Sequence, residues 1–185
     1  ATAGVMEGVI STTDTITCSG VFDLVEPPIN CWIYSETYKS GSHGAETLTT
    51  AIRDSCNYYF NTVGYMLGMN GEKYVDEDGI EVLTRYANMY GFDSTTGIEI
   101  DETAPRISGS DAPRTSMGQG ENAFTTTQLA RYVNTVANGG TCYDLTLLDR
   151  IKDPEGNPLE EKEPVVHNKL ELPDELWNSI HSGMN

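Results

Sequence analysis

Residues 46–67 read ETLTTAIRDSCNYYFNTVGYML, two helical patterns joined by the short polar break Asp54-Ser55-Cys56-Asn57. Apolar residues fall on one face of each helix, and they are Leu48, Ala51 and Ile52 before the break and Tyr59, Phe60, Val63 and Leu67 after it. Because Cys56 should turn inward, Ser55 and Asn57 can point together into the space that the two helices border. Taken alone, the pattern favours a simpler interpretation, in which Ser55 and Asn57 cap the second helix.

The composition is that of a globular chain long enough for one domain, or for one domain and a small appendage. Of the 185 residues, 38% are hydrophobic and 21% are charged, and the net charge is −17. This charge would repel a phosphate backbone, so nucleic acid is excluded as a partner. No run of apolar residues approaches the length of a membrane helix, and no signal peptide is recognisable.

The four cysteines, Cys18, Cys31, Cys56 and Cys142, contain no C-x-x-C pair. Three of them and His43 are spaced evenly along the chain, whereas zinc sites usually draw their ligands from close pairs. We therefore expect neither a metal nor any other cofactor. A disulfide between Cys18 and Cys31 is the better-supported alternative in an oxidising compartment.

The order of the predicted elements is that of a helix-rich α+β chain. Residues 23–44 form a loop excursion, residues 46–140 a helical lobe, residues 143–172 a strand and turn region, and residues 173–185 the start of another helix. Within these regions the patterns predict a helix over Ile80–Tyr90 that ends at Gly91 and a strand over Leu145–Ile151.

A further helix starts at the capping box that spans Thr125 to Gln128. Its apolar stripe is predicted to consist of Leu129, Val133 and Val136-Ala137.

Three kinds of catalytic site compete. Cys56 with His43 as base is unfavourable because Cys56 should face inward, where a thiol behaves as a small apolar group. A pair of carboxylates of the glycosidase type has no support, since 28 acidic residues allow any pairing. The third kind is serine acyl transfer, in which Ser55 and Asn57 would be auxiliary polar groups in a cleft.

A set of motifs in a fixed order makes the third alternative specific. Ser55-Cys56-Asn57 is followed some sixty residues later by Gly118-Gln119-Gly120, then by the Thr125 capping run and by Ala137-Asn138-Gly139-Gly140. This order resembles the transpeptidase domain of the penicillin-binding proteins over nearly the whole chain. The segments around Cys18 and Cys31 and the Leu176-Trp177 segment resemble the high-molecular-weight class B members, which crosslink peptidoglycan.

The resemblance implies the helical lobe of the penicillin-binding protein and serine β-lactamase fold, with its sheet largely missing. In that family a Ser-x-x-Lys serine is acylated by a D-Ala-D-Ala stem peptide or a β-lactam, and Ser-x-Asn and Lys-Thr-Gly complete the cleft. By this resemblance Ser55 relays a proton and Asn57 orients the lysine and the substrate amide. Gly118, Gln119 and Gly120 would shape the cleft.

The sequence departs from the family pattern in two of the three motifs. No lysine has a serine three residues before it, and Lys39-Ser40-Gly41 precedes Ser55, where the family places Lys-Thr-Gly well after it. We therefore expect a fragment, residues 1–185 of a partial transpeptidase domain, that is inactive alone. Its parent is expected at the extracytoplasmic face of the bacterial cytoplasmic membrane, anchored by an N-terminal helix and able to contact other cell-wall synthesis proteins.

Two alternatives stay open at this point. One is a serine β-lactamase or a β-lactam sensor domain, which shares the helical lobe. The other is a non-catalytic, acidic protein-binding domain of the cell envelope, in which Ser55 and Asn57 would serve only as helix caps.

Overall fold

The computed structural model describes residues 1–185, and the chain forms two compact units. The first unit contains residues 1–86, 108–122 and 172–185, and the second contains residues 87–107 and 123–171. Seven α-helices occur with five two-stranded antiparallel sheets, so the predicted mixed α+β class is confirmed. None of the helices has the length and apolar character needed to span a bilayer.

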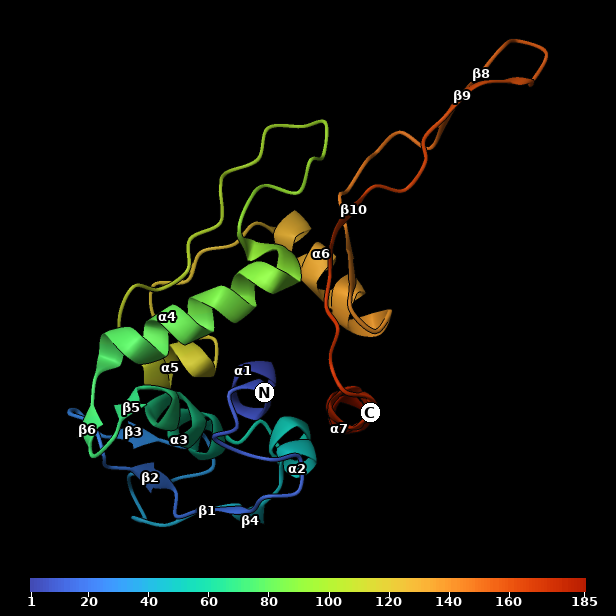
Figure 1. Cartoon of the computed structure of the whole chain (residues 1–185). Helices are drawn as coiled ribbons and strands as arrows, with labels where there is room; N and C mark the ends of the chain where they lie inside the picture. Colours follow the sequence, from blue (N-terminus) through green and yellow to red (C-terminus); the bar gives the residue numbers. More distant parts are fainter. The chain divides into compact units, whose positions relative to one another are not determined.

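The first unit is built from helices with three small two-stranded sheets (Figure 1). Its helices are α1 (Thr2–Met6), α2 (Leu48–Arg53), α3 (Asn57–Leu67), α4 (Asp76–Ala87), α5 (Ala112–Ser116) and α7 (Asp174–Met184). Its strands are β1 (Ile16–Cys18), β2 (Val21–Phe22), β3 (Ile29–Asn30), β4 (Gly44–Glu46), β5 (Met69–Asn70) and β6 (Lys73–Tyr74).

The apolar faces predicted for α2 and α3 form part of the core of this unit. The side chains buried there include Leu48, Ala51, Tyr59, Val63 and Leu67. Such burial supplies most of the stability of short helices, because helices of this length are marginal in water by themselves.

Two glycines allow the helices of this unit to approach closely. A Cβ atom at Gly64 of α3 would lie 2.6 Å from the carbonyl oxygen of Ala112 in α5. A Cβ atom at Gly183 of α7 would lie 2.7 Å from the carbonyl oxygen of Thr49 in α2. A larger side chain at either position would push the paired helices apart.

Two strand pairs fold the loop excursion back onto the start of α3. Strands β1 and β4 pair antiparallel with Cys18 opposite Gly44. Strands β2 and β3, which lie between them in the sequence, form a hairpin, and the amide of Cys31 donates to the carbonyl of Gly20 at 2.8 Å. As a result, segments more than twenty residues apart in the sequence become neighbours.

The second unit is centred on α6 (Thr126–Ala137). Its other elements are the π-helical turn η1 (Asn88–Phe92) and the strands β7 (Thr141–Tyr143), β8 (Arg150–Lys152), β9 (Pro158–Glu161) and β10 (Val166–Lys169). The capping box is confirmed, because Thr125 accepts from the amide of Gln128, and the Gln128 side chain accepts from the amide of Thr125 at 2.9 Å. Strands β8 and β9 form an arm that extends away from α6 (Figure 1).

Of the apolar stripe predicted on α6, only Val136 is buried, and the prediction is wrong for the rest. Leu129 and Val133 are 46% and 60% exposed, whereas Gln128, Arg131 and Thr135 are buried. Arg131 accounts for the difference, because its guanidinium donates to the carbonyls of three residues of the preceding segment, namely Gly91, Ser94 and Thr95. Polar side chains that satisfy backbone carbonyls therefore occupy the inner face.

Two predicted boundaries also change. The helix predicted over Ile80–Tyr90 begins earlier, at Asp76, and gives way to η1 after Ala87, with Gly91 at a φ of 93°. Of the strand predicted over Leu145–Ile151, only its last two residues lie in β8. The amide of Leu145 instead donates to the carbonyl of Thr96, so this part of the segment is tied to a loop.

Candidate active site

The turn between α2 and α3 presents Ser55 and buries Cys56. Ser55 has a φ of +50°, in the left-handed region, and its side chain is exposed. Cys56 follows with extended backbone and no exposed surface, and Asn57 begins α3 half-buried. The predicted alternation, with Cys56 turned inward between two polar residues, is therefore present.

The capping interpretation of this turn is wrong. The N-cap residue of α3 is Cys56, and no side chain caps the helix. The hydroxyl of Ser55 and the amide group of Asn57 make no hydrogen bond within the chain. Both polar groups are therefore available to an external partner.

An open hollow of about 540 Å³ lies beside Ser55. Besides Ser55, its lining consists of Trp32, Ile33, His43, Arg53 and Asp54. Trp32 Nε1 donates to the carbonyl of Asp54 at 3.0 Å, which ties the loop excursion to the turn. Arg53 donates to both carboxylate oxygens of Asp54, at 2.7 and 2.9 Å, and holds the pKa of that carboxyl below its usual range.

Gly118, Gln119 and Gly120 form a turn after α5. The two glycines have φ values of +86° and +87°, which other residues rarely adopt. The amide of Gln119 donates to the carbonyl of Arg114 at 3.0 Å, and its carbonyl accepts from Asn122 at 2.8 Å. This turn belongs to the same unit as Ser55, but no hydrogen bond joins the two.

Four side chains far apart in the sequence, those of Cys18, Cys31, His43 and Cys56, meet in one cluster. The sulfur atoms of Cys18, Cys31 and Cys56 and a ring nitrogen of His43 all lie within 4.8 Å of one another. All three cysteines are free, so the disulfide expected between Cys18 and Cys31 is not formed. Burial raises the pKa of the Cys56 thiol above its usual range, which agrees with the argument against Cys56 as a nucleophile.

The even spacing of Cys18, Cys31, His43 and Cys56 along the chain, which argues against a zinc site, did not indicate that they would meet. The pairing of β1 with β4 removes the separation between Cys18 and His43, since Cys18 lies opposite the residue that follows His43. The available signal was compositional, because three of the four cysteines and one of the three histidines fall within residues 18–56.

Comparison with known proteins gives a consistent result. The family model described as the penicillin binding protein transpeptidase domain matches residues 1–185. Penicillin-binding protein 2B of Streptococcus pneumoniae is 28% identical over 200 residues, which cover 98% of this chain and 28% of that protein. Peptidoglycan D,D-transpeptidase MrdA of Haemophilus influenzae is 27% identical over 164 residues, which cover 80% of this chain and 23% of that protein.

Solved structures agree on the fold. The structure of penicillin-binding protein 2B from Streptococcus pneumoniae strain R6 matches with a TM-score of 0.78 and 25% identity, over 98% of this chain and 31% of that one. Penicillin-binding protein 2 of Helicobacter pylori, solved in complex with MreC, matches with a TM-score of 0.72 and 18% identity, over 98% of this chain and 32% of that one.

An imipenem acyl-enzyme complex of penicillin-binding protein A from Mycobacterium tuberculosis matches with a TM-score of 0.68 and 20% identity, over 91% of this chain and 37% of that one. The chain spans less than a third of the length of the two curated relatives.

Proposed function

Because the chain belongs to the penicillin-binding protein transpeptidase domain family, we propose that the whole protein is a class B, serine-type peptidoglycan D,D-transpeptidase. Its substrate would be a stem peptide ending in D-Ala-D-Ala, and β-lactams would acylate the same serine. The related proteins support this class of reaction, because they include a peptidoglycan D,D-transpeptidase and a β-lactam acyl-enzyme.

Within this reaction we assign the Ser55 hydroxyl to proton relay and the Asn57 amide to orienting the substrate and the catalytic lysine. The single observation that carries the assignment is that both groups lie at the start of α3 without any hydrogen bond inside the chain. A free hydroxyl can pass a proton between a lysine and a leaving group, and a free amide can both donate to and accept from a peptide. The rigid start of a helix is a suitable platform for both.

The groups that complete the site would lie in parts of the whole protein outside residues 1–185. These are a Ser-x-x-Lys, whose serine attacks the carbonyl, and a Lys-Thr-Gly, which holds the substrate carboxylate. Residues 1–185 alone would then bind no β-lactam covalently. Gly118, Gln119 and Gly120 would shape the cleft, because their turn belongs to the same unit as Ser55.

We place the whole protein at the extracytoplasmic face of the bacterial cytoplasmic membrane, where peptidoglycan is crosslinked. Contact with other cell-wall synthesis proteins is proposed on the same basis, since a related penicillin-binding protein was solved in complex with MreC.

Labelling with a fluorescent penicillin tests the proposal. The whole protein should be labelled covalently in a one-to-one ratio, and residues 1–185 alone should not be labelled. In the whole protein, Ser55→Ala should lower the acylation rate by about 100- to 10,000-fold, the usual contribution of a positioned proton-transfer group. Ser182→Ala, which removes an exposed hydroxyl from α7, is the matched control and should leave the rate unchanged.

Stable labelling of residues 1–185 alone would overturn the assignment of the nucleophile to another part of the protein. An unchanged acylation rate in the Ser55→Ala protein would overturn the relay role. A deacylation assay separates the transpeptidase from a β-lactamase, because only the β-lactamase would turn over the labelled drug rapidly.

A further inference from the structure

The cluster of Cys18, Cys31, His43 and Cys56 is assembled by the backbone of the loop excursion and of the segments beside it. Cys18 ends β1, and His43 immediately precedes β4, its pairing partner. Cys31 follows β3 and is held by the hydrogen bond that its backbone amide donates to the carbonyl of Gly20. Cys56 is the N-cap residue of α3, and its amide donates to the carbonyl of Ala51 at 2.9 Å. Four separate backbone segments thus each contribute one ligand-type side chain to the same point.

The two nitrogen–sulfur distances within the cluster are close to those of a tetrahedral metal site. His43 Nδ1 lies 3.4 Å from the sulfur of Cys31 and 3.8 Å from the sulfur of Cys18. Zinc binds sulfur at about 2.3 Å and histidine nitrogen at about 2.0 Å, so a tetrahedral ion separates a sulfur from a nitrogen ligand by roughly 3.6 Å. The observed separations lie on both sides of this value, and every other pair of ligand atoms in the cluster lies within 4.8 Å.

Packing alone does not account for this group of side chains. All three cysteines are buried, at 0% to 1% exposure, and His43 Nε2 is buried without a hydrogen-bond partner. The ring of Trp32 packs against the imidazole with a centroid separation of 5.4 Å and fixes its position. A disulfide could use only two of the three sulfurs. Three thiols and one imidazole in a closed environment are a donor set of structural zinc sites.

We propose that Cys18, Cys31, His43 and Cys56 bind one structural Zn²⁺ ion. All four positions of the tetrahedron are taken by the protein, so the ion has no place for substrate or water and holds the fold together. Three ligands come from residues 18–43, and the fourth lies between Ser55 and Asn57. The ion therefore joins the loop excursion to the turn that presents these two side chains and holds Ser55 in position. This positioning effect on Ser55 rests on the proposed function, whereas the metal site does not.

Metal analysis of the 185-residue chain tests the site directly. Protein produced with zinc and purified in a thiol reductant should retain about one zinc per chain by mass spectrometry of the metal content. X-ray absorption at the zinc edge should report three sulfur ligands and one nitrogen ligand. Cys31→Ser should lose the zinc, and Cys142→Ser, which removes the one buried cysteine outside the cluster, should keep it.

A wild-type chain without zinc would overturn the proposal, as would a Cys18–Cys31 disulfide in protein purified without reductant. A Cys31→Ser chain with full zinc content would also overturn it. The X-ray absorption measurement uses the wild-type chain, so misfolding of a variant does not affect it. A zinc ion surrounded by oxygen ligands would contradict the proposed site.

The positioning effect is tested in the whole protein by the rate of penicillin acylation. Cys31→Ser should lower the rate by about 10- to 100-fold, the usual effect of a residue that orients a site, and Cys142→Ser should not. Equal rates in the two variants would overturn the positioning role. A wild-type protein that binds zinc but is not acylated at all would contradict the proposed function and leave the metal site standing.

Discussion

The carboxylate of Glu102 is expected to contribute strongly to the stability of the second unit. One oxygen accepts from the amide of Thr96 at 2.6 Å and from its hydroxyl at 2.9 Å. The other oxygen accepts from the hydroxyl of Thr125 at 2.7 Å and from that of Thr127. The side chain thus joins a loop to the first turn of α6, where a negative charge is also favoured by the helix dipole.

These contacts set the size of the effect. Burial acts to raise the pKa of Glu102, but the hydrogen bonds from Thr127, Thr96 and Thr125 outweigh it and lower the pKa from 4.5 to about 2. At about 1.4 kcal/mol for each pH unit, this shift sets an upper bound of about 3 kcal/mol, and solvent screening of the partly exposed carboxylate reduces the expected stabilisation to about 1–2 kcal/mol at neutral pH. Because the pKa is lower in the folded state, this contribution is complete above pH 4.5 and is lost as the pH falls toward 2.

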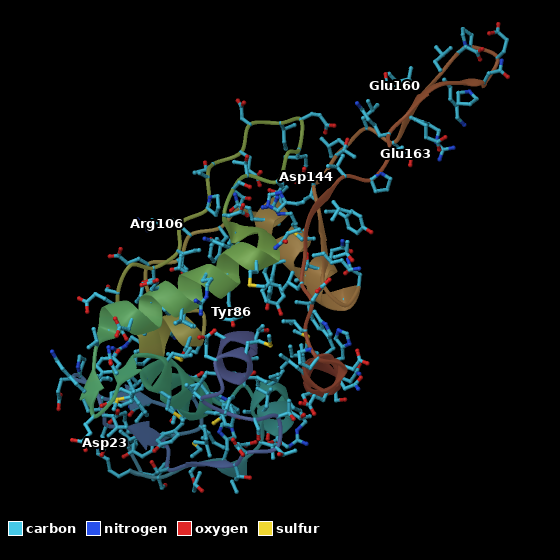
Figure 2. The ribbon with its side chains drawn as sticks, in the orientation of Figure 1. Asp23, Tyr86, Arg106, Asp144, Glu160 and Glu163 are labelled. Carbon is cyan, nitrogen blue, oxygen red and sulfur yellow. The ribbon has the colours of Figure 1, made fainter.

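Urea denaturation followed by circular dichroism measures this contribution. Glu102→Gln should lower the free energy of unfolding by about 1–2 kcal/mol at pH 7 and by only about 0.5 kcal/mol at pH 3. Glu163→Gln is the control, because Glu163 is exposed (Figure 2) and should change stability by less than about 0.5 kcal/mol. A loss below about 1 kcal/mol at pH 7, or an equal loss at the two pH values, would refute the reasoning.

Two further predictions concern buried side chains and use the same measurement. Arg131→Met removes the donors to three carbonyls and the ion pair with Asp144, 3.6 Å away, so it should cost about 3–5 kcal/mol. Arg85 pairs with Glu7 and its side chain is 54% exposed, so Arg85→Met should cost less than about 1 kcal/mol. Equal losses in the Arg131→Met and Arg85→Met variants would contradict the role of burial. Leu48→Ala should cost about 2–5 kcal/mol and Leu147→Ala less than about 0.5 kcal/mol, because Leu48 is fully buried and Leu147 is exposed. A loss at Leu48 as small as that at Leu147 would contradict the place of Leu48 in the core.

Local patterns in the sequence predict much of this fold. The Thr125 capping box, the apolar faces of α2 and α3, and the glycine after α4 each depend on residues within one or two turns. The inner face of α6 could not be read in this way. Arg131 is buried there because its partners are carbonyls of a segment about forty residues earlier, which a periodicity argument does not include.

The same distinction applies to the candidate sites. The order of residues along the chain indicates Ser55 and Asn57, because a polar break between two apolar helical faces is a local signal. The cluster of Cys18, Cys31 and His43 depends on strand pairing between distant segments, so its even spacing in the sequence is misleading. The prediction that Ser55 and Asn57 cap α3 was wrong because the residue between them, Cys56, occupies the N-cap position.

The backbone of Ser55 has a consequence for any attempt to engineer this chain. A residue with a side chain pays about 1–2 kcal/mol to adopt the left-handed conformation found there, and glycine does not. A screen for thermal stability would therefore enrich Ser55→Gly, the substitution that removes the hydroxyl proposed for proton relay. Selection for a more durable protein and selection for a working enzyme would diverge at this one residue.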